Sequence, residues 1–492
     1  MQKQYVISRE TMYALDSRTM QEIAIPSRVL MELAGSQSAQ HIAEKYGLTK
    51  RFIILCSHGN NSGDGFVIAR WLINMGAEVE IIMVGDENKM SPETLANYNL
   101  CRKLACPIHK DNKYESTLSQ PNIVLIDALL GIGFQGKLRG EVASLIKLTN
   151  SLRSPKVAID IPSGVDANTG ETEDAFQADY TLTMAAIKQG MLLNTAPTYC
   201  GEIEVIDISI PDSYFPHNNK IGQIHTNLQY PQRFKHSHKG DYGKILIIAG
   251  SPSFSGAAIL CSKACVKSGS GLVKLLHPKG MESIFESTLT EVMTIGYDVQ
   301  LQIEELLAWS DVVLIGPGLG TSEVAKQMLK KVLLSYNKTL VIDADGLNIL
   351  ASNKHLLKES KADILLTPHL GELSRLCDIP LPELQKDVLN LVRKFAEEYS
   401  LSLLVKSSVS FYLDQSSLIF TTAGNDGLST GGSGDVLAGI ITSFIGQKMN
   451  IQEAAVNGSL YLGRIAELLA KAKRTFSLTP SAIIDNIGRP EI

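Results

Sequence analysis

The sequence predicts an α/β protein of two domains, each built around a parallel sheet. Short apolar runs alternate with helical patterns along nearly the whole chain, and runs such as RFIILC at 51–56 are apolar throughout. At 492 residues the chain is also too long for one ordinary domain, since domains contain roughly 100–200 residues. Together these features indicate strands joined by right-handed helical crossovers.

The first half alternates helices and strands up to about residue 208. Apolar residues at helical spacing predict helices within 8–46, where Ser8 suits a cap and Pro26 starts a second helix. Strands are expected at 51–56, 79–84, 123–126, 157–161, 180–184 and 203–208, and helices at 66–75 and from 91 to about 106. The glycine-rich segment 57–65 is expected to be a loop.

The pattern stops between Pro211 and His238, where prolines, histidines and polar residues gather, and then starts again. We therefore predict domains at 1–222 and 223–492. Further parallel strands are expected at 244–249, before 276, and at 312–315, 340–342, 364–366 and 401–405, with a last helix at 451–471. The spacing of the three histidines at 225, 236 and 238 suits no single helix face, so we interpret them as linker residues and not as metal ligands.

The composition excludes several classes of protein. The net charge is −5 with acids and bases interspersed, so we expect no nucleic-acid partner. The seven cysteines are scattered and form no CxxC, which indicates reduced thiols and a cytoplasmic protein. The N-terminus lacks the apolar core of a signal peptide, and no uncharged run reaches the ~18 residues of a membrane span, so we expect no membrane partner.

Three strands of the first half end in glycines, amides and carboxylates, at 59–65, 127–137 and 160–166. In open α/β sheets the ligand crevice lies outside the carboxyl ends of the strands, so these segments should meet at one edge. Each segment alone is also what an ordinary strand-to-helix turn prefers. Jointly they predict a site.

The stretch GNDGLSTGGSGDVLAG at 424–439 predicts a second site. A glycine-rich loop leaves backbone N–H groups uncovered, and a helix starting there adds its unpaired N–H groups and the positive end of its dipole. Such a place binds anions, most often phosphate. Asp435 at the join would repel phosphate, which suits a base for a hydroxyl that attacks a phosphoryl group. The alternative is an ordinary helix cap.

Three further features of the second half can bind ligands. Asp343 and Asp345 can hold Mg²⁺ through water, since hard cations prefer oxygen ligands. Lys406 follows a strand beside several serines and suits a diphosphate or nucleotide, although surface Lys and Ser are common. His369, after Thr-Pro, is a candidate ligand contact or a solvent-exposed histidine. No GxxxxGK[ST] motif occurs, so any kinase-like chemistry is of another type.

These motifs carry a resemblance to known families. The stretch 424–439 resembles the GTGD anion-hole motif of ribokinase-like proteins, and SPSFSGAA, GPGLG, DADGL, TPHLGE and LVKSS narrow the match to NAD(P)H-hydrate dehydratases. The first half resembles NAD(P)H-hydrate epimerases, whose pattern is close to GxGNNGGDG, then DALxGxG, then DIPSGxD. Together the halves resemble bacterial bifunctional NAD(P)H-hydrate repair enzymes. The resemblance implies a Rossmann-like three-layer domain followed by a ribokinase-like α/β domain.

The resemblance also implies the activities. An epimerase domain at 1–222 would interconvert the R and S hydrates of NADH and NADPH (NADHX and NADPHX), and a dehydratase domain at 223–492 would dehydrate the S hydrate using ADP with Mg²⁺. K⁺ is implied for the epimerase domain, and we expect a homo-oligomer. Ser57 and Ser62 stand where many epimerases have glycine, so Ser62 adds a side chain where we expect backbone to approach the ligand.

Site residues follow from the matched motifs. Around the hydrate in the first half, the resemblance places Asn60, Asn61, Ser62, Gly63, Asp64, Gly131, Ile132, Gly133, Phe134, Gln135, Gly136, Lys137 and Asp160. Asp160 is the candidate acid or base, with Lys188 as the alternative. Asn61, Asp127 and Ser163 are similar to the family's potassium ligands, and all-oxygen ligation fits such a cation.

In the second half, Ala258, Gly320, His369 and Asp435 match positions that contact the hydrate. The nucleotide positions are Lys406, Ser407, Ser408, Val409, Ser410, Asn425, Asp426, Gly427, Leu428, Ser429, Thr430, Gly431, Gly432, Ser433 and Gly434. A rival interpretation is a ribokinase-like small-molecule kinase with a non-catalytic N-terminal binding domain. A kinase would retain its phosphorylated product, whereas a dehydratase would release phosphate.

Overall fold

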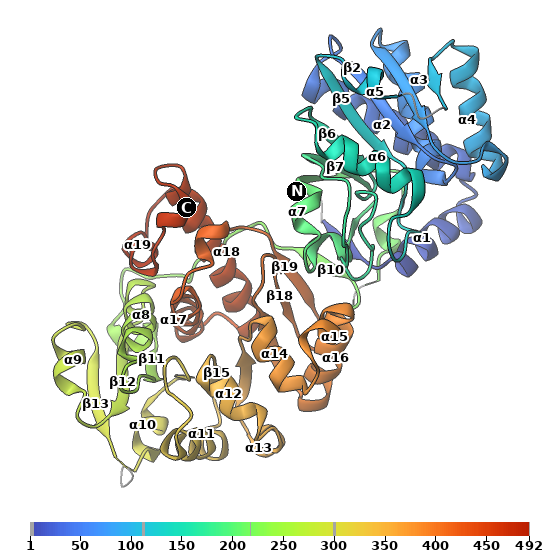
Figure 1. Cartoon of the computed structure of the whole chain (residues 1–492). Helices are drawn as coiled ribbons and strands as arrows, with labels where there is room; N and C mark the ends of the chain where they lie inside the picture. Colours follow the sequence, from blue (N-terminus) through green and yellow to red (C-terminus); the bar gives the residue numbers. More distant parts are fainter. Residues whose placement is uncertain (1–3, 111–113, 217, 299–301, 492) are drawn as a thin grey trace. The chain divides into compact units, whose positions relative to one another are not determined.

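The computed structural model describes residues 4–110, 114–216, 218–298 and 302–491. The chain divides into two compact units, Met1–Gly222 and Gln223–Ile492, which Figure 1 colours from blue to green and from green to red. Each unit has its own hydrophobic core. Strand β10 (Gly222–Ile224) lies where the units divide.

The first unit contains a sheet in the order β4-β3-β2-β5-β6-β7-β9, in which each neighbouring pair runs parallel. Its strands are β2 (Arg51–Cys56), β3 (Glu78–Met83), β4 (Ile108–His109), β5 (Ile123–Ala128), β6 (Lys156–Ile159), β7 (Tyr180–Met184) and β9 (Glu202–Ile206). A short parallel pair joins β1 (Tyr5–Ile7) to β8 (Ile187–Lys188). The predicted parallel sheet is confirmed for this unit.

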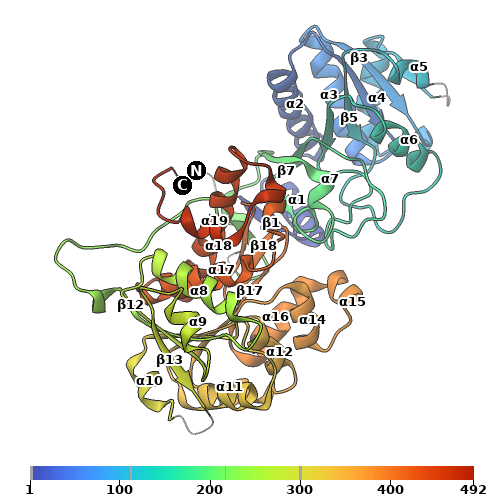
Figure 2. The same cartoon turned by 60° about the vertical axis from the view of Figure 1, so that its left-hand side comes forward.

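Helices cover both faces of this sheet. They are α1 (Arg9–Glu22), α2 (Ser27–Tyr46), α3 (Asn60–Asn74), α4 (Pro92–Lys103), α5 (Glu115–Leu118), α6 (Gly140–Asn150) and α7 (Pro197–Cys200). Alternate strand residues face opposite sides: Ile54 packs with α2, α3 and α4, whereas Ile53 packs with α5 and α6. Figure 2 shows these helices on the two sides of the sheet. The unit is therefore three-layered.

Helix α3 begins at Asn60, six residues before the expected start at Phe66, so most of the glycine-rich segment is helical and not a loop. Its glycines serve packing. A Cβ on Gly63 would lie 2.5 Å from the Cε of Met31, and one on Gly65 would lie 2.6 Å from the Cβ of Ala128. The absence of these side chains lets α3 lie directly against α2 and β5.

The second unit has a larger sheet in the order β13-β12-β11-β14-β15-β16-β17-β18-β19. Its strands are β11 (Lys244–Ile248), β12 (Leu272–Pro278), β13 (Met293–Tyr297), β14 (Val312–Ile315), β15 (Thr339–Ile342), β16 (Asp363–Leu366), β17 (Ser402–Val405), β18 (Ser410–Leu413) and β19 (Leu418–Thr421). The ladder is parallel from β13 to β17, as predicted.

The last two strands of this ladder are antiparallel, so the expectation of an all-parallel second sheet is wrong. The link between β18 and β19 is short, and the Oδ1 of Asp414 accepts hydrogen bonds from the N–H groups of Ser416 and Ser417 at 2.8 Å each. Antiparallel strands can be joined by such a turn, whereas parallel strands need a long crossover.

The helices of the second unit are α8 (Ser255–Lys267), α9 (Glu282–Glu286), α10 (Glu304–Trp309), α11 (Glu323–Ser335), α12 (Asp345–Ala351), α13 (His355–Glu359), α14 (Leu370–Cys377), α15 (Leu381–Lys386), α16 (Val388–Tyr399), α17 (Ser433–Gly446), α18 (Ile451–Ala470) and α19 (Pro480–Asp485). Helices α8, α17, α18 and α19 share a core with one face of the sheet. Among the described residues, no helix is both long and apolar enough to cross a membrane.

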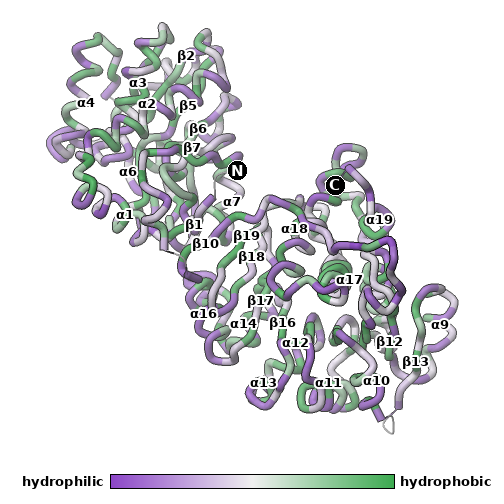
Figure 3. The backbone as a smooth tube through the Cα atoms, turned by 180° about the vertical axis from the view of Figure 1, so that it is seen from behind, coloured by the Kyte–Doolittle hydropathy of each residue, from purple (hydrophilic) through white to green (hydrophobic). Residues whose placement is uncertain are grey.

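Helix α17 is central to this unit. It is buried along nearly its whole length from Val436, and Figure 3 shows its tube in the green of hydrophobic residues. It lies so close to α8 that a Cβ on Gly439 would be 2.3 Å from the carbonyl oxygen of Cys261. This packing fixes where the N-terminus of α17, and with it Asp435, can lie.

Candidate active sites

A cavity of about 520 Å³ opens at the carboxyl ends of β2, β5 and β6 in the first unit. The described residues that line it come from α1, α2, the start of α3 and the loops after the three strands. The lining is Met12, Tyr13, Asp16, Met20, Ser27, Leu30, Met31, Ala34, Ser57, His58, Gly59, Asn60, Asn61, Asp64, Leu129, Leu130, Gly131, Ile132, Gly133, Phe134, Asp160, Met184 and Ile208. This is where ligands bind in open α/β sheets.

Most of the sequence-predicted residues of the first half meet here, and some do not. The cavity is lined by Asn60, Asn61, Asp64, Gly131, Ile132, Gly133, Phe134 and Asp160, but not by Ser62, Gly63, Gln135, Gly136 or Lys137. Lys137 forms an ion pair with Glu173 at 2.6 Å instead.

Ser62 is fully buried behind the cavity wall. Its Oγ accepts from the N–H of Ser57 at 2.6 Å and donates to the carbonyl of Ala128 at 2.7 Å. The expectation that this side chain intrudes where the ligand approaches is therefore corrected: because α3 has already begun, Ser62 points toward β5 and joins two walls of the site.

Asp160 ends β6 with a left-handed backbone, φ +68°, which is rare for a residue with a Cβ. Its N–H donates to the carbonyl of Leu182 at 2.7 Å, and its Oδ1 accepts from the N–H of Met184 and from the buried ammonium of Lys188. Such strained backbone costs about 1–3 kcal/mol and is found mainly at functional sites.

Of the two acid–base candidates, Asp160 lines the cavity and Lys188 does not. The Lys188 ammonium also donates to the Oγ1 of Thr183 and the carbonyl of Met184, each at 2.9 Å, so its donors are engaged. The arrangement favours Asp160 as the group that meets a ligand, with Lys188 holding it from behind.

Two further acids face the same cavity: Asp64, which the sequence predicted as a binding residue, and Asp16, which it did not. Burial raises the pKa of Asp16 to about 6 and raises the pKa of Asp64 well above its usual range, and the charge of Asp160 raises both further. Asp64 was named only as a binding residue, and Asp16 lies on α1, in a segment without glycine or strand-end signals. Only its helical spacing from Met12 and Met20 could have placed it on the same face.

Asp127 and Ser163 are hydrogen-bonded to each other, and the carbonyl of Leu130 joins Ser163 to Asn61. The Oγ of Ser163 donates to the Oδ1 of Asp127 at 2.7 Å, and the N–H of Ser163 donates to its Oδ2 at 2.8 Å. The Nδ2 of Asn61 donates to the carbonyl of Leu130 at 2.9 Å, and the Ser163 Oγ lies 3.3 Å from the same oxygen. Burial raises the pKa of Asp127 to about 6 against its hydrogen bonds from Ser163. The Oδ1 of Asn61 is buried and has no hydrogen-bond partner among the described residues, and such an unpaired oxygen fits a cation with oxygen ligands.

In the second unit, the glycine-rich stretch ends at Gly432, the N-cap of α17, with φ +101°. Asp435 is the third residue of the helix, so the N-cap is Gly432 and not Asp435. The alternative that Asp435 is the helix cap is therefore not what the structure shows. Asp435 lies in the first turn of α17, where a helix attracts negative charge.

Lys406 interacts electrostatically with Asp435 and forms an ion pair with Asp343, which follows β15. Its ammonium donates to the Oδ1 of Asp343 at 2.6 Å, with side chains 18% and 1% exposed. Burial lowers the pKa of Lys406, but the charges of Asp343, Glu372 and Asp435 outweigh burial and raise it overall. Burial raises the pKa of Asp435 to about 7; Asp343 adds to this effect and Lys406 opposes it. A carboxyl with a pKa near neutrality suits a general base.

His369 is the N-cap of α14. Its Nδ1 accepts from the N–H of Gly371 at 2.9 Å and of Glu372 at 3.3 Å, while Glu372 accepts from the His369 N–H at 2.9 Å. Because Nδ1 accepts, the proton of the neutral ring lies on Nε2. Burial lowers the pKa of His369, which keeps it neutral, and a backbone bridge places it beside Lys406.

The predicted nucleotide segment 425–434 leads into α17, and the Nζ of Lys406 lies close to it, 3.4 Å from where a Cβ on Gly434 would be. Asn425 caps a short 3₁₀ turn, Asp426–Leu428, so this segment is not wholly loop. The Nδ2 of Asn425 and the Oγ of Ser433 are buried without hydrogen-bond partners in the described part of the chain. The side chain of Val409 is buried. Unpaired buried polar atoms indicate a place that a polar ligand completes.

Two other predicted positions differ in their surroundings. Ala258 is fully buried between α8 and the sheet, so its side chain contacts the core and not a ligand. Gly320, with φ +72°, donates its N–H to the Oδ2 of Asp345 at 2.9 Å. Within the described ranges no group of three or more His, Cys, Asp or Glu side chains forms a metal cluster.

The fold and these two sites define a class: a two-unit α/β enzyme with an acidic cavity in one unit and a mostly buried carboxyl at the start of a buried helix in the other. Comparisons with known proteins narrow the class. Residues 27–190 match the model of the YjeF-related protein N-terminus, and residues 245–489 match that of NAD(P)H-hydrate dehydratase.

Curated relatives cover almost the whole chain. The bifunctional NAD(P)H-hydrate repair enzyme Nnr of Moorella thermoacetica is 32% identical over 98% of this chain and 95% of that protein. The enzyme of the same name from Escherichia coli is 32% identical over 94% of this chain and 90% of that protein. A solved ADP/ATP-dependent NAD(P)H-hydrate dehydratase from Bacillus subtilis, co-crystallized with ATP/Mg²⁺, is 23% identical over 54% of this chain and 97% of that one, with a TM-score of 0.46. The chain belongs to the family of bifunctional NAD(P)H-hydrate repair enzymes.

Proposed function

We propose that this chain repairs hydrated NADH and NADPH, with residues 1–222 epimerising the R and S hydrates and residues 223–492 dehydrating the S hydrate at the expense of ADP. Membership of the repair family supports the pair of activities. The observation that carries the chemistry is the buried Asp435, with a pKa raised to about 7, at the start of a helix suited to phosphate.

In the second unit, Asp435 accepts the proton of the ring hydroxyl while that oxygen attacks the β-phosphorus of ADP, and AMP leaves. The amides from Gly432 to Gly434 stabilise the charge that develops on the phosphoryl oxygens. The lone pair of the ring nitrogen then expels phosphate, and loss of the adjacent C–H proton restores the dihydronicotinamide. Phosphate is a far better leaving group than hydroxide.

Several residues around Asp435 support this reaction. The ammonium of Lys406 holds Asp343 and opposes full protonation of Asp435. The neutral Nε2–H of His369 is suited to donate a hydrogen bond to the hydrate. Mg²⁺ bound with the nucleotide would neutralise phosphate charge. Asp343 and Asp345 are the carboxylates that would hold it through water; Lys406 pairs with Asp343, whereas Asp345 accepts hydrogen bonds from neutral N–H groups.

In the first unit, Asp160 is the proposed acid and base. Protonating the ring hydroxyl lets water leave as the ring nitrogen's lone pair forms an iminium, and water that adds to the other face gives up its proton to the carboxylate. Asn61, Asp127 and Ser163 would hold K⁺ beneath the cavity, where the unpaired oxygen of Asn61 fits a cation. The ion would supply positive charge close to the substrate's phosphates.

A test follows both reactions in one experiment. NADHX is incubated with the chain and ADP or ATP, the epimers are separated by chromatography, and recovery of reduced nicotinamide absorbance is measured together with phosphate release. Recovery of NADH with stoichiometric phosphate supports the proposal. Accumulation of a phosphorylated product, with no phosphate released, would support the rival small-molecule kinase.

A further inference from the structure

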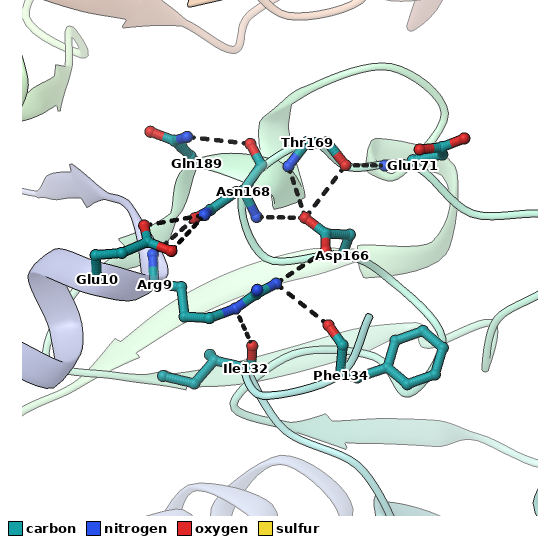
Figure 4. Close-up of polar contacts among 9 residues, drawn as sticks. All are labelled: Arg9, Glu10, Ile132, Phe134, Asp166, Asn168, Thr169, Glu171 and Gln189. Atoms are coloured by element: carbon teal, nitrogen blue, oxygen red, sulfur yellow. Dashed lines mark hydrogen bonds and ion pairs between the residues drawn. The ribbon is translucent and has the colours of Figure 1, made fainter. Parts of the chain in front are cut away.

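A buried arginine that the proposed chemistry does not use lies directly behind the ligand cavity of the first unit. Arg9 begins α1, outside the matched span 27–190, and its side chain is only 6% exposed. Its Nε donates to the carbonyl of Ile132 at 2.5 Å, and its Nη2 donates to the carbonyl of Phe134 at 3.2 Å and to the Oδ2 of Asp166 at 2.8 Å (Figure 4).

The network around Arg9 fixes it in place. The Oδ1 of Asp166 accepts from the N–H groups of Asn168 and Thr169 at 2.9 Å each. The side chain of Asn168 in turn accepts from the backbone N–H of Arg9 at 2.7 Å and donates to Glu10 at 2.9 Å (Figure 4). Breaking a buried charge pair is strongly unfavourable, so the guanidinium has little freedom.

This anchoring determines how the loop faces the cavity. In a trans peptide the C=O and the following N–H point in opposite directions. The carbonyl of Ile132 points toward Arg9, so the N–H of Gly133 points away from it. Gly133 lines the cavity and Arg9 does not, so this N–H is directed to the cavity side.

Such a donor suits this cavity. Its described lining contains three carboxylic acids, Asp16, Asp64 and Asp160, and no lysine or arginine. These carboxyl groups would repel an anionic part of a ligand. The N–H of Gly133 is a neutral donor that the loop can offer to such a group, whereas the N–H of Phe134 already donates to the carbonyl of Gly131 at 3.1 Å.

We propose that Arg9 is a positioning residue that holds the turn Gly131–Phe134 so that its amides bind a phosphate group of the dinucleotide hydrate. This rests on the proposed epimerase activity of the first unit. Arg9 contacts the loop and not the ligand, so its loss should weaken binding of phosphate-bearing substrates and leave the chemical step at Asp160 nearly unchanged.

The test uses the full chain with Arg9→Gln and Arg9→Lys. The matched control is Arg18→Gln on the same helix, where the side chain is 46% exposed and forms an ion pair with Glu22. For epimerisation of NADPHX we expect Arg9→Gln to raise KM about tenfold while kcat stays within about threefold. Lysine keeps the charge but cannot reach both carbonyls and Asp166, so its KM should be intermediate.

A phosphate-free substrate separates positioning from simple loss of structure. With the hydrate of reduced nicotinamide riboside, KM, or its inhibition constant against NADPHX, should be the same in wild type and Arg9→Gln. An equal loss with both substrates would mean that Arg9 only supports the fold and would overturn the proposal, as would an unchanged KM for NADPHX. If melting curves show that Arg9→Gln unfolds the first unit, Arg9→Lys decides by the same two measurements. Absence of epimerisation in the wild type would instead refute the proposed function.

Discussion

Replacing Asp435 by asparagine should greatly slow the chemical step while leaving the site intact. Asp435 is the third residue of α17 and Gly432 is its N-cap, so the carboxyl is not the cap of the helix. Asparagine has nearly the same shape and removes only the charge. We expect turnover in dehydration to fall by about 10²–10⁴, the usual contribution of a positioned general base.

The same substitution should stabilise the protein, and by an amount that depends on pH. Raising the pKa of Asp435 from 3.8 to about 7 destabilises its ionised form by roughly 4 kcal/mol. Below pH 3.8 the carboxyl is neutral in both the folded and unfolded states, so it does not lower the stability of the fold. Between pH 3.8 and 7 the carboxyl ionises in the unfolded state first, so the loss of folding stability grows with pH. Above pH 7 this loss is constant. The melting temperature of Asp435→Asn should therefore exceed that of wild type increasingly from pH 4 to 7.

Two assays check this reasoning. The wild-type rate of dehydration should rise with pH through a pKa near 7, as Asp435 becomes the carboxylate, and the residual rate of Asp435→Asn should lack this rise. Nucleotide affinity should be kept or improve, because a negative charge near phosphate is gone. Asp363→Asn, the same change at an exposed position of β16, is the matched control. Joint loss of nucleotide affinity and activity would refute the assignment, and so would a near-normal rate.

Three other predictions follow from the two sites. Asp127→Ala should lower epimerisation and remove its dependence on K⁺ while dehydration in the same chain is unchanged; equal K⁺ dependence in the variant would contradict the cation site. Lys406→Met leaves Asp343 buried and unpaired, so it should cost about 3–5 kcal/mol of stability in denaturant unfolding and shift the rise in dehydration rate above pH 7. A fragment of residues 223–492 should fold and dehydrate the S hydrate with ADP; a folded but inactive fragment would argue against two independent enzymes.

The alternating pattern was enough to predict most strands, because buried parallel strands are apolar on both faces. The segments at 51–56, 180–184 and 312–315 coincide with β2, β7 and β14. The hairpin of β18 and β19 was missed because it lies next to a predicted ligand loop and its turn has no glycine or proline signal.

The site was predictable where it follows strand ends and not where helices contribute to it. Asp160 and Asp435 were found from the loops that carry them. Asp16, which faces the cavity, and Arg9, which holds the loop behind it, lie on α1, far from the strand ends in sequence, and no local motif marks either of them. The helical start of α3 was missed for a related reason: glycine is a poor helix former, and only the close approach of α2 and β5 explains why glycines are in that helix.

The glycines of α3 also affect how this enzyme can vary during evolution. At Gly65 a new methyl group would meet the Cβ of Ala128 on a central strand, so that position is closed to substitution. At Gly63 it would meet first the tip of Met31, a flexible side chain that can move aside, and then the hydroxyl of Thr94 at 2.9 Å. Met31 lines the ligand cavity, so an alanine at Gly63 would reshape the space around the substrate from outside it. A substitution at a position that only packs helices together can thus change which substrates fit the cavity, although the residues that contact the substrate are unchanged.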